Sequence, residues 1–406
     1  MKLVSIDDVR EAQTLLKGVA ERTPLELSRA VSDRCGGPVY LKCENLQRTG
    51  AFKIRGAYNR IARLDDAERA RGIVAASAGN HAQGVALAAQ LLGVEATVFM
   101  PEGAAIPKVE ATSRYGAHVV LEGDIYDEAF HAAEKHAANT GAVMIHPFDH
   151  ADVIAGQGTV SLEILEELPE TATILVPVGG GGLISGVACA AKALKPSIKI
   201  IGVEPEGAAS VSRAWENGAV IPLDTLSTVA DGLAARQAGA ICLTHVQSFV
   251  DQIVTVNDVQ IAEALLLVAE RAKMVVEPAG AAGVAALMNG SCDVTYPVVV
   301  VLSGGNIDPL LLLRVIRYGM GSAGRFLSFA TQLPDRAGEL TRLSGVISDS
   351  GANVIGVEHR RDGVVNRLLG DVEITMQLET RGPEHVKSVI AILEENGFKP
   401  YALSLT

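Results

Sequence analysis

Short apolar segments alternate with helix-like segments along most of this 406-residue chain. Between residues 72 and 145 the apolar segments are 72–76, 95–100, 117–121 and 143–145. A second alternating run extends from residue 155 to residue 302. Strands that are joined by helices run parallel and carry helices on both faces of their sheet. The pattern therefore predicts two doubly wound α/β lobes, with a smaller lobe at about residues 44–149 inserted in the larger one.

The composition changes after a glycine-rich stretch, and we expect a linker at residues 321–325. Residues 326–406 then follow the order βαββαβ, which is typical of a ferredoxin-like module. This module has no obvious nucleophile, base or metal-ligand cluster. The sequence thus predicts a catalytic domain over residues 1–320 and a separate binding or regulatory module.

Charge and cysteine usage exclude several functional classes. A net charge of -12 argues against nucleic acid or an anionic membrane as partner. No apolar run reaches the length of a membrane span, and charge appears too early for a signal peptide. The five cysteines are scattered and lack C-x-x-C spacing. They fit reduced thiols in the cytoplasm, and no metal site is predicted.

A tetraglycine turn joins an apolar strand to a helix. It consists of Gly179, Gly180, Gly181 and Gly182, followed by Leu183. Glycine has no Cβ, and a helix N-terminus favours anions, so the backbone N–H groups here can hold a phosphate ester. A tight structural turn is the alternative. No G-x-x-x-x-G-K-[ST] motif supports nucleoside triphosphate hydrolysis.

A dinucleotide site is the weaker interpretation of the same turn. Glu204 ends the next strand, at a spacing similar to that of an acidic ribose ligand. The G-x-G-x-x-G pattern fails, however, because Ile184 or Ser185 stands at its last position. A nicotinamide-dependent oxidoreductase is therefore a secondary hypothesis.

Two further turns follow apolar strands. The N–H groups of Ser77-Ala78-Gly79-Asn80-His81 can hold a carboxylate, and Asn80 offers a donor and acceptors to a ring hydroxyl. A simple N-cap is the alternative there, and His81 can be structural. The hydroxyl of Ser303 can bond a heterocyclic nitrogen, although a turn serine is the plain interpretation.

Three other residues gain meaning only in this context. Lys53 follows a glycine turn and has Phe52 beside it, but a lysine alone is usually a surface residue. Glu277 stands in an apolar stretch and is either partly buried or salt-bridged. Gly232 can let a flat ring approach the backbone, or it can serve a plain turn.

Together these motifs resemble the pyridoxal-phosphate enzymes of the tryptophan-synthase-β type, and within them the threonine ammonia-lyases. The segments that carry the resemblance are 51–57, 77–84, 155–159, 178–183 and 303–306. The last module resembles an ACT domain, with residues 333–340 as its first loop and 351–354 as its second strand entry.

The resemblance implies pyridoxal 5'-phosphate as cofactor. The implied catalytic residues are Lys53, which holds the cofactor covalently and takes the Cα proton, and Ser77. The implied cofactor-binding residues are Phe52, Lys53, Asn80, Gly179, Gly180, Gly181, Gly182, Leu183, Gly232, Glu277, Ser303 and Gly304. The substrate carboxylate is expected at Ser77, Ala78, Gly79, Asn80 and His81.

The implied reaction is β-elimination of L-threonine to 2-oxobutanoate and ammonia, as in isoleucine biosynthesis, with L-serine as a secondary substrate. Serine or hydroxyaspartate ammonia-lyase, racemase, and a non-catalytic amino-acid sensor are the alternatives. Related racemases carry a serine where Ala78 stands, so Ala78 favours a lyase. They also bind a divalent ion with an acidic pair. Glu204 matches one member of that pair, but Ser210 replaces the other.

The ACT resemblance implies allosteric control by a branched-chain amino acid, isoleucine or valine. Such modules bind their ligand between two copies, here near Gly338 and Asn353. We therefore expect a homo-oligomer, either a dimer or a tetramer.

Overall fold

The computed structural model describes residues 3–361 and 370–402. The chain divides into two compact units, Met1–Pro309 and Leu310–Thr406. The division thus lies before residue 320, and the expected linker at 321–325 is partly helical because α14 spans Pro309–Ser322. Val315 and Gly319, one helical turn apart, are both buried in this helix. The apolar spacing therefore continues the helix through glycines that the sequence pattern assigns to a linker.

The larger sheet of the first unit has six strands in the order β1-β2-β10-β7-β8-β9. All neighbours are parallel except the antiparallel pair β1 and β2. The strands are β1 Leu25–Leu27, β2 Val39–Lys42, β7 Thr173–Pro177, β8 Lys199–Pro205, β9 Gln252–Val256 and β10 Val298–Val301. Helices α9 (Gly182–Leu194) and α13 (Pro278–Met288) both pack on β7. Every residue of β7 and β10 is buried, which explains their continuous apolar sequences.

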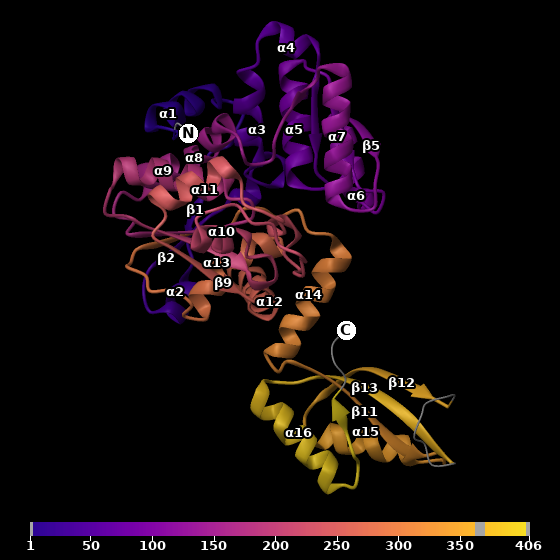
Figure 1. The fold of residues 1–406 in the computed structure, drawn as a ribbon. Coiled ribbons are helices and arrows are strands. Elements are labelled where there is room, and N and C mark those ends of the chain that lie inside the picture. The colour runs from indigo at the N-terminus through magenta and orange to yellow at the C-terminus, as the bar shows by residue number, and fades with distance from the viewer. Residues whose placement is uncertain (1–2, 362–369, 403–406) are drawn as a thin grey trace. The chain divides into compact units, whose positions relative to one another are not determined.

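The smaller sheet has four parallel strands in the order β5-β4-β3-β6. The strands are β3 Ile73–Ala76, β4 Ala96–Met100, β5 His118–Leu121 and β6 Val143–Met144. Helices α5 (Asn80–Leu92) and α7 (Tyr126–Thr140) pack on β3 and β4 (Figure 1). In sequence all four strands lie between β2 and β7, so the smaller lobe is inserted in the larger one. The predicted fold class of two doubly wound lobes is confirmed.

The other helices of the first unit complete the layers around these sheets (Figure 1). They are α1 Ile6–Leu15, α2 Arg29–Cys35, α3 Lys53–Ala62, α4 Asp66–Ala70, α6 Ile106–Arg114, α8 Ala151–Glu167, α10 Ser210–Asn217, α11 Ala240–Phe249 and α12 Asp258–Leu267. Helix α8 packs against both α3 and α9. Helix α8 therefore connects α3, which starts at Lys53, to α9, which begins in the tetraglycine turn.

The second unit has the predicted βαββαβ order, which confirms a ferredoxin-like module. Its antiparallel strands run β12-β13-β11-β14 across the sheet. The elements are β11 Phe326–Pro334, α15 Glu339–Asp349, β12 Asn353–Arg360, β13 Asp371–Glu379, α16 Pro383–Glu395 and β14 Tyr401–Ala402. The alternating residues Val372, Ile374, Met376 and Leu378 of β13 are buried in its core, while β12 is an exposed edge strand.

The described chain lacks a membrane-spanning helix and a cluster of metal ligands. None of its helices is both long and apolar enough to cross a bilayer. Within residues 3–361 and 370–402, no three or more His, Cys, Asp and Glu side chains gather as metal ligands would.

Candidate active site

A cavity of about 930 Å³ lies where several strands of the first unit end. The turns after β3, β7 and β10 contribute Ser77, Gly179 and Ser303 to its wall. Carboxyl ends of parallel strands are the usual place for ligands in open α/β sheets. The predicted site residues that line this one cavity are Phe52, Lys53, Ser77, Ala78, Gly79, Asn80, His81, Gly179, Gly180, Gly181, Gly182, Leu183, Gly232, Glu277 and Ser303.

Lys53 is the first residue of α3, so its side chain leaves the helix at its start. Its Nζ donates to the carbonyl oxygen of Pro147 at 2.9 Å and lies 5.1 Å from the centre of the Phe52 ring. Burial lowers the pKa of Lys53 to about 8, although Cys242 and Glu277 act in the opposite direction. An amine with this pKa is partly neutral at physiological pH.

The glycine turn presents a set of free donors to the cavity. In the described chain, the backbone N–H groups of residues 179–183, between β7 and the first turn of α9, have no protein acceptor. Helix starts leave such N–H groups unpaired, and they attract anions. The glycines are also needed sterically: a Cβ on Gly180 would lie 2.3 Å from the ring of Phe148, and one on Gly182 would lie 2.7 Å from Cβ of Phe148.

Gly304, in the turn after β10, does not line the cavity but contacts the loop of residues 45–52 that precedes Lys53, called the lysine loop below. It forms an isolated antiparallel bridge with Ala51, and the N–H of Phe52 donates to the carbonyl of Ser303 at 3.2 Å. The N–H of Gly305 donates to the carbonyl of Gly50 at 2.9 Å. These backbone contacts bring the hydroxyl of Ser303 close to the start of α3, although about 250 residues separate them in the chain.

Asn80 and Glu277 form a direct side-chain contact. Asn80 Nδ2 donates to Glu277 Oε1 at 2.7 Å, and Asn80 Oδ1 accepts from Asn306 Nδ2 at 2.8 Å. Asn306 Nδ2 also donates to the carbonyl of Thr49 at 2.6 Å. Burial raises the pKa of Glu277 to about 7, and Asp231 adds to this effect. Sequence reasoning places Asn306 in a motif but assigns it no contact.

The turn before α5 is held by its own side chains. Ser77 Oγ accepts from the N–H of Gly79 at 3.1 Å. His81 Nε2 lies 2.8 Å from the carbonyl oxygen of Ile145, so this nitrogen carries the proton and donates. Burial, together with the charge of Lys53, lowers the pKa of His81 to about 3. His81 is therefore a neutral, structurally engaged side chain.

Two ion pairs cross the cavity wall from the smaller lobe to the larger one. Lys108 Nζ lies 2.7 Å from Asp231 Oδ2, and Arg236 Nη1 lies 3.1 Å from Asp127 Oδ2. Gly232, next to Asp231, faces Ala279 and Glu277. The four charged residues were not predicted from the sequence, because ion pairs between distant segments leave no local sequence pattern.

Sequence reasoning also missed the turn after β6. Pro147 accepts from Lys53, Phe148 covers the glycine turn, and the carboxylate of Asp149 accepts from the first N–H groups of α11 at 2.9–3.1 Å. His146 Nδ1 accepts from the N–H of Asp149 at 2.8 Å. This turn also follows an apolar strand and precedes a helix, and that position was a usable signal.

A buried charge network lies beneath the first turn of α3. Arg55 contacts Glu44 at 2.8 Å and Glu163 at 2.6 Å, and Lys42 contacts Glu163 at 2.6 Å. Arg55, Lys42 and Glu44 are fully or almost fully buried. Burial acts to raise the pKa of Glu44, but the charge and hydrogen bonds of Arg55 outweigh it and lower that pKa. The network ties the lysine helix to β2 and α8.

The remaining candidates lie outside the cavity. Both oxygens of Glu204 accept from N–H groups at the start of α10, from Val211 and Ser212 at 2.8 Å each. Glu204 therefore acts as a cap of α10, and burial raises its pKa to about 7. In the second unit, Gly338 is the N-cap of α15 with φ 96°, and Asn353 starts β12 and donates to Glu379 at 3.3 Å.

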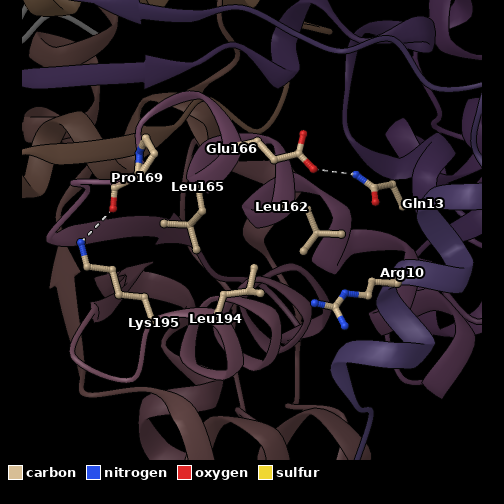
Figure 2. A pocket seen from close by; sticks show the side chains of 8 residues that line it. All are labelled: Arg10, Gln13, Leu162, Leu165, Glu166, Pro169, Leu194 and Lys195. Atoms are coloured by element: carbon tan, nitrogen blue, oxygen red, sulfur yellow. Dashed lines mark hydrogen bonds between the residues drawn. The ribbon is translucent and has the colours of Figure 1, made fainter.

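A second, smaller pocket of about 370 Å³ lies among α1, α8 and α9. Figure 2 shows leucine side chains facing its centre and polar groups around them. Lys195 Nζ donates to the carbonyl of Pro169 at 3.0 Å, and Gln13 Nε2 donates to Glu166 at 3.3 Å. These polar groups are already paired, and we assign no chemistry to this pocket.

The chain is similar to known proteins in sequence and in fold. The model of the family described as pyridoxal-phosphate dependent enzyme matches residues 16–304. The chain is 46% identical to an L-threonine ammonia-lyase of Thermotoga maritima over 397 residues, covering 98% of this chain and 99% of that protein. A solved structure of threonine deaminase isoform 2 from Solanum lycopersicum has a TM-score of 0.74 and 37% identity, covering 78% of this chain and 90% of that one. Maize serine racemase has a TM-score of 0.72 and 39% identity, covering 79% and 99%.

Proposed function

The chain belongs to the family of pyridoxal-phosphate-dependent enzymes, and we propose that it is a threonine ammonia-lyase. It converts L-threonine to 2-oxobutanoate and ammonia, with L-serine as a secondary substrate. Water leaves the carbon skeleton and is regained on hydrolysis, so the net change is loss of ammonia. The observation that carries this proposal is that a lysine amine and a set of unpaired backbone N–H groups face one cavity. The near full-length identity to a protein of that name supports it.

The donor set of the cavity fits pyridoxal phosphate. The unpaired N–H groups of residues 179–183 suit a phosphate dianion, because phosphate only accepts hydrogen bonds there. Ser303 and Asn80 offer a hydroxyl and an amide to a substituted pyridine, and Phe52 offers a ring face. When bound, pyridoxal phosphate supplies an electron-withdrawing ring that acidifies the Cα–H bond of an amino acid.

Lys53 is the proposed covalent anchor and base. Its pKa of about 8 lets the amine accept a proton near neutral pH, which is the condition for efficient proton transfer. Lys108, another amine on the cavity wall, is paired with Asp231 and is less free to react. Proton removal from Cα therefore falls to Lys53.

The turn before α5 is the proposed carboxylate site. The first N–H groups of a helix favour an anion, and Ala78, Gly79 and His81 expose backbone to the cavity. Ser77 Oγ accepts from Gly79, which leaves its own O–H proton available for a substrate oxygen. This is the basis for giving Ser77 a role beside Lys53.

The similarity to maize serine racemase makes racemisation the second candidate. Racemisation needs a proton donor on the face of the substrate opposite to the lysine. Ala78 lines the cavity and carries no such proton. We therefore propose elimination, and measuring D-serine formation against 2-oxo acid formation from L-serine distinguishes the two. D-serine as the main product would reject the lyase assignment.

One labelling experiment tests the function directly. The purified protein is reduced with borohydride and the modified peptide is mapped. We expect a phosphopyridoxyl group on Lys53 and loss of threonine turnover in Lys53→Ala. Label on another lysine, or none, would reject the proposal.

We propose that the second unit is an ACT regulatory module that binds isoleucine or valine near Gly338 and Asn353. The apolar residues Val354, Ile355 and Val357 are 40–52% exposed on the edge strand β12, which supports pairing with a second copy. A homo-oligomer, dimer or tetramer, follows.

The cysteines form no disulfides in the described chain, which supports a reducing cytoplasmic location.

The regulatory proposal has its own test. Threonine saturation curves are recorded with and without isoleucine or valine, and the oligomeric state is measured by sedimentation. We expect a shifted midpoint and a species larger than the monomer. Unchanged curves together with no binding of either amino acid would reject the module's regulatory role.

A further inference from the structure

We propose that Asn306 is a positioning residue: it fixes the orientation of the Asn80 side-chain amide so that Asn80 presents an N–H donor to the ligand in the cavity. This inference deepens the proposed function and rests on pyridoxal phosphate binding beside Asn80. The observation that carries it is a chain of side-chain hydrogen bonds that begins at a backbone carbonyl.

The direction of the chain is set at Thr49. A carbonyl oxygen only accepts hydrogen bonds, so the Asn306 atom that lies 2.6 Å from the carbonyl oxygen of Thr49 must be its amino nitrogen. The same nitrogen lies 2.8 Å from an atom of the Asn80 amide. Its two hydrogens are then shared between Thr49 and Asn80, so the Asn80 atom that it faces is the carbonyl oxygen.

The other end of the Asn80 amide confirms this direction. Asn80 Nδ2 lies 2.7 Å from Glu277 Oε1, and a carboxylate oxygen accepts. A flipped Asn80 amide would bring oxygen against oxygen at ionised Glu277 and amino group against amino group at Asn306. Amide orientation in a structure is normally assigned from such a network. Here Asn306 requires the orientation, because its amino group is fixed by Thr49, and ionised Glu277 agrees with it.

The side chains of Asn306 and Glu277 are packed closely against the backbone. Each lies beside a glycine, at a place where a larger residue would collide with it. A Cβ on Gly50 would lie 2.3 Å from Asn306 Oδ1, and a Cβ on Gly304 would lie 2.3 Å from Glu277 Oε1. Glu277 is also held by its N–H, which donates to the carbonyl of Gly304 at 3.1 Å. The network is thus packed between the lysine loop and the turn after β10.

Asn80 keeps one unpaired N–H for the ligand. Its Oδ1 already accepts from Asn306 and one hydrogen of Nδ2 is donated to Glu277, while the residue lines the cavity. An N–H donor favours a ligand atom that accepts. Asn80 therefore favours a deprotonated ring oxygen over a hydroxyl, which the sequence alone left open.

The test compares two isosteric variants of the full-length protein loaded with pyridoxal phosphate. Asn306→Asp replaces the donating amino group by an oxygen that repels both Thr49 and Asn80. Asn45→Asp is the matched control: Asn45 Nδ2 donates to the carbonyl of Val275 at 3.0 Å, linking the same lysine loop to the segment before Glu277 without touching Asn80. Asn45 is also buried, so a general loss of packing would affect both variants.

We measure the visible absorption of the bound cofactor against pH and its dissociation constant by equilibrium dialysis. Asn306→Asp should raise the pH midpoint at which the visible absorption band of the bound cofactor titrates. It should also raise the dissociation constant of the cofactor about tenfold, roughly the effect of one hydrogen bond. Asn45→Asp should leave the band unchanged. Equal bands and affinities in the two variants would overturn the inference, and if Asn306→Asp does not fold, Asn306→Ser is judged by the same readouts. A wild-type protein without cofactor on Lys53 would instead reject the proposed function.

Discussion

Lys53 Nζ lies 2.9 Å from the carbonyl oxygen of Pro147 and donates a hydrogen bond to it. This contact joins the start of α3 to the turn after β6, two segments of the smaller lobe that close one side of the cavity. A single carbonyl does not replace the hydration of an ammonium group, and burial accordingly lowers the pKa of Lys53 to about 8. Burial of the protonated amine therefore costs folding free energy, and it leaves the amine easier to deprotonate.

Lys53→Met should stabilise the cofactor-free protein at neutral pH. The pKa of Lys53 is about 8 in the fold against an ordinary 10.5, so the unfolded chain binds more protons between these pH values. The loss in free energy of unfolding that burial of the Lys53 ammonium causes is fully present below pH 8, and it disappears as the pH rises to 10.5. Because the side chain is partly open to the cavity, we expect a gain on the order of 1–2 kcal/mol. Urea unfolding of both proteins near neutral pH and in alkali measures it, and a gain that does not depend on pH contradicts this explanation.

Gly180→Ala should disturb the proposed phosphate site through Phe148. The new Cβ would lie 2.3 Å from the aromatic ring, and overpacking costs about 1–3 kcal/mol. We expect much weaker binding of pyridoxal phosphate, and partial recovery when Phe148→Ala is added. A double-mutant cycle on cofactor affinity measures the coupling. Gly103→Ala, where a Cβ meets nothing within 4 Å, is the control. Additive effects of the two substitutions would refute the role of Phe148.

Arg55→Met should destabilise the first unit strongly. It leaves Glu44 and Glu163 with Lys42 as the remaining nearby cation, and breaking a buried ion network costs about 3–5 kcal/mol. Arg10→Ala is the control, because Arg10 and its partner Asp7 are exposed and such a pair is worth about 0–1 kcal/mol. Urea unfolding compares the two, and equal losses would show that the buried network has no special weight.

Lys108→Met should weaken the contact between the lobes at the cavity wall. The ion pair with Asp231 is partly exposed, so its loss is worth about 0.2–1 kcal/mol, less than a tenfold change in rate. We expect a raised KM for threonine and a weaker response to added salt, which screens the wild-type pair. Steady-state kinetics at low and high salt measures this. Identical salt dependence in both proteins would mean that the pair does not contribute.

Gly345→Ala should stabilise the second unit. Gly345 lies inside α15, and a Cβ there meets nothing within 4 Å. Alanine is favoured over glycine within a helix by about 0.5–1 kcal/mol. Gly338→Ala should do the opposite, because φ at Gly338 is 96°. Hydrogen exchange of the α15 amides reports both changes, and stabilisation by both substitutions would contradict the backbone argument.

The apolar periodicity was sufficient to predict the fold, because the sequence of each β strand shows whether one or both of its faces are buried. Val298–Val301 is apolar throughout because it is buried on both faces, and β13 alternates because one face of its sheet is covered. The same reasoning was wrong for residues 321–322, where glycine content suggested a linker and the structure continues α14. Local composition shows that glycine disfavours a helix, but it does not show which neighbouring residues are buried. Here Val315, one turn before Gly319, is buried, and the helix continues.

By itself, the sequence determined which chemical groups follow each strand: the Lys53 amine, the glycine amides, the Asn80 amide and the Ser303 hydroxyl. Such groups are recognisable because a strand, a turn and a helix start are short-range patterns. Only the tertiary structure decided what each group can do. The direction of the Asn80 amide depends on Asn306 and Glu277, 226 and 197 residues away in the chain. The pKa of Lys53 depends on the surroundings that bury it, and such surroundings are complete only when distant segments pack together.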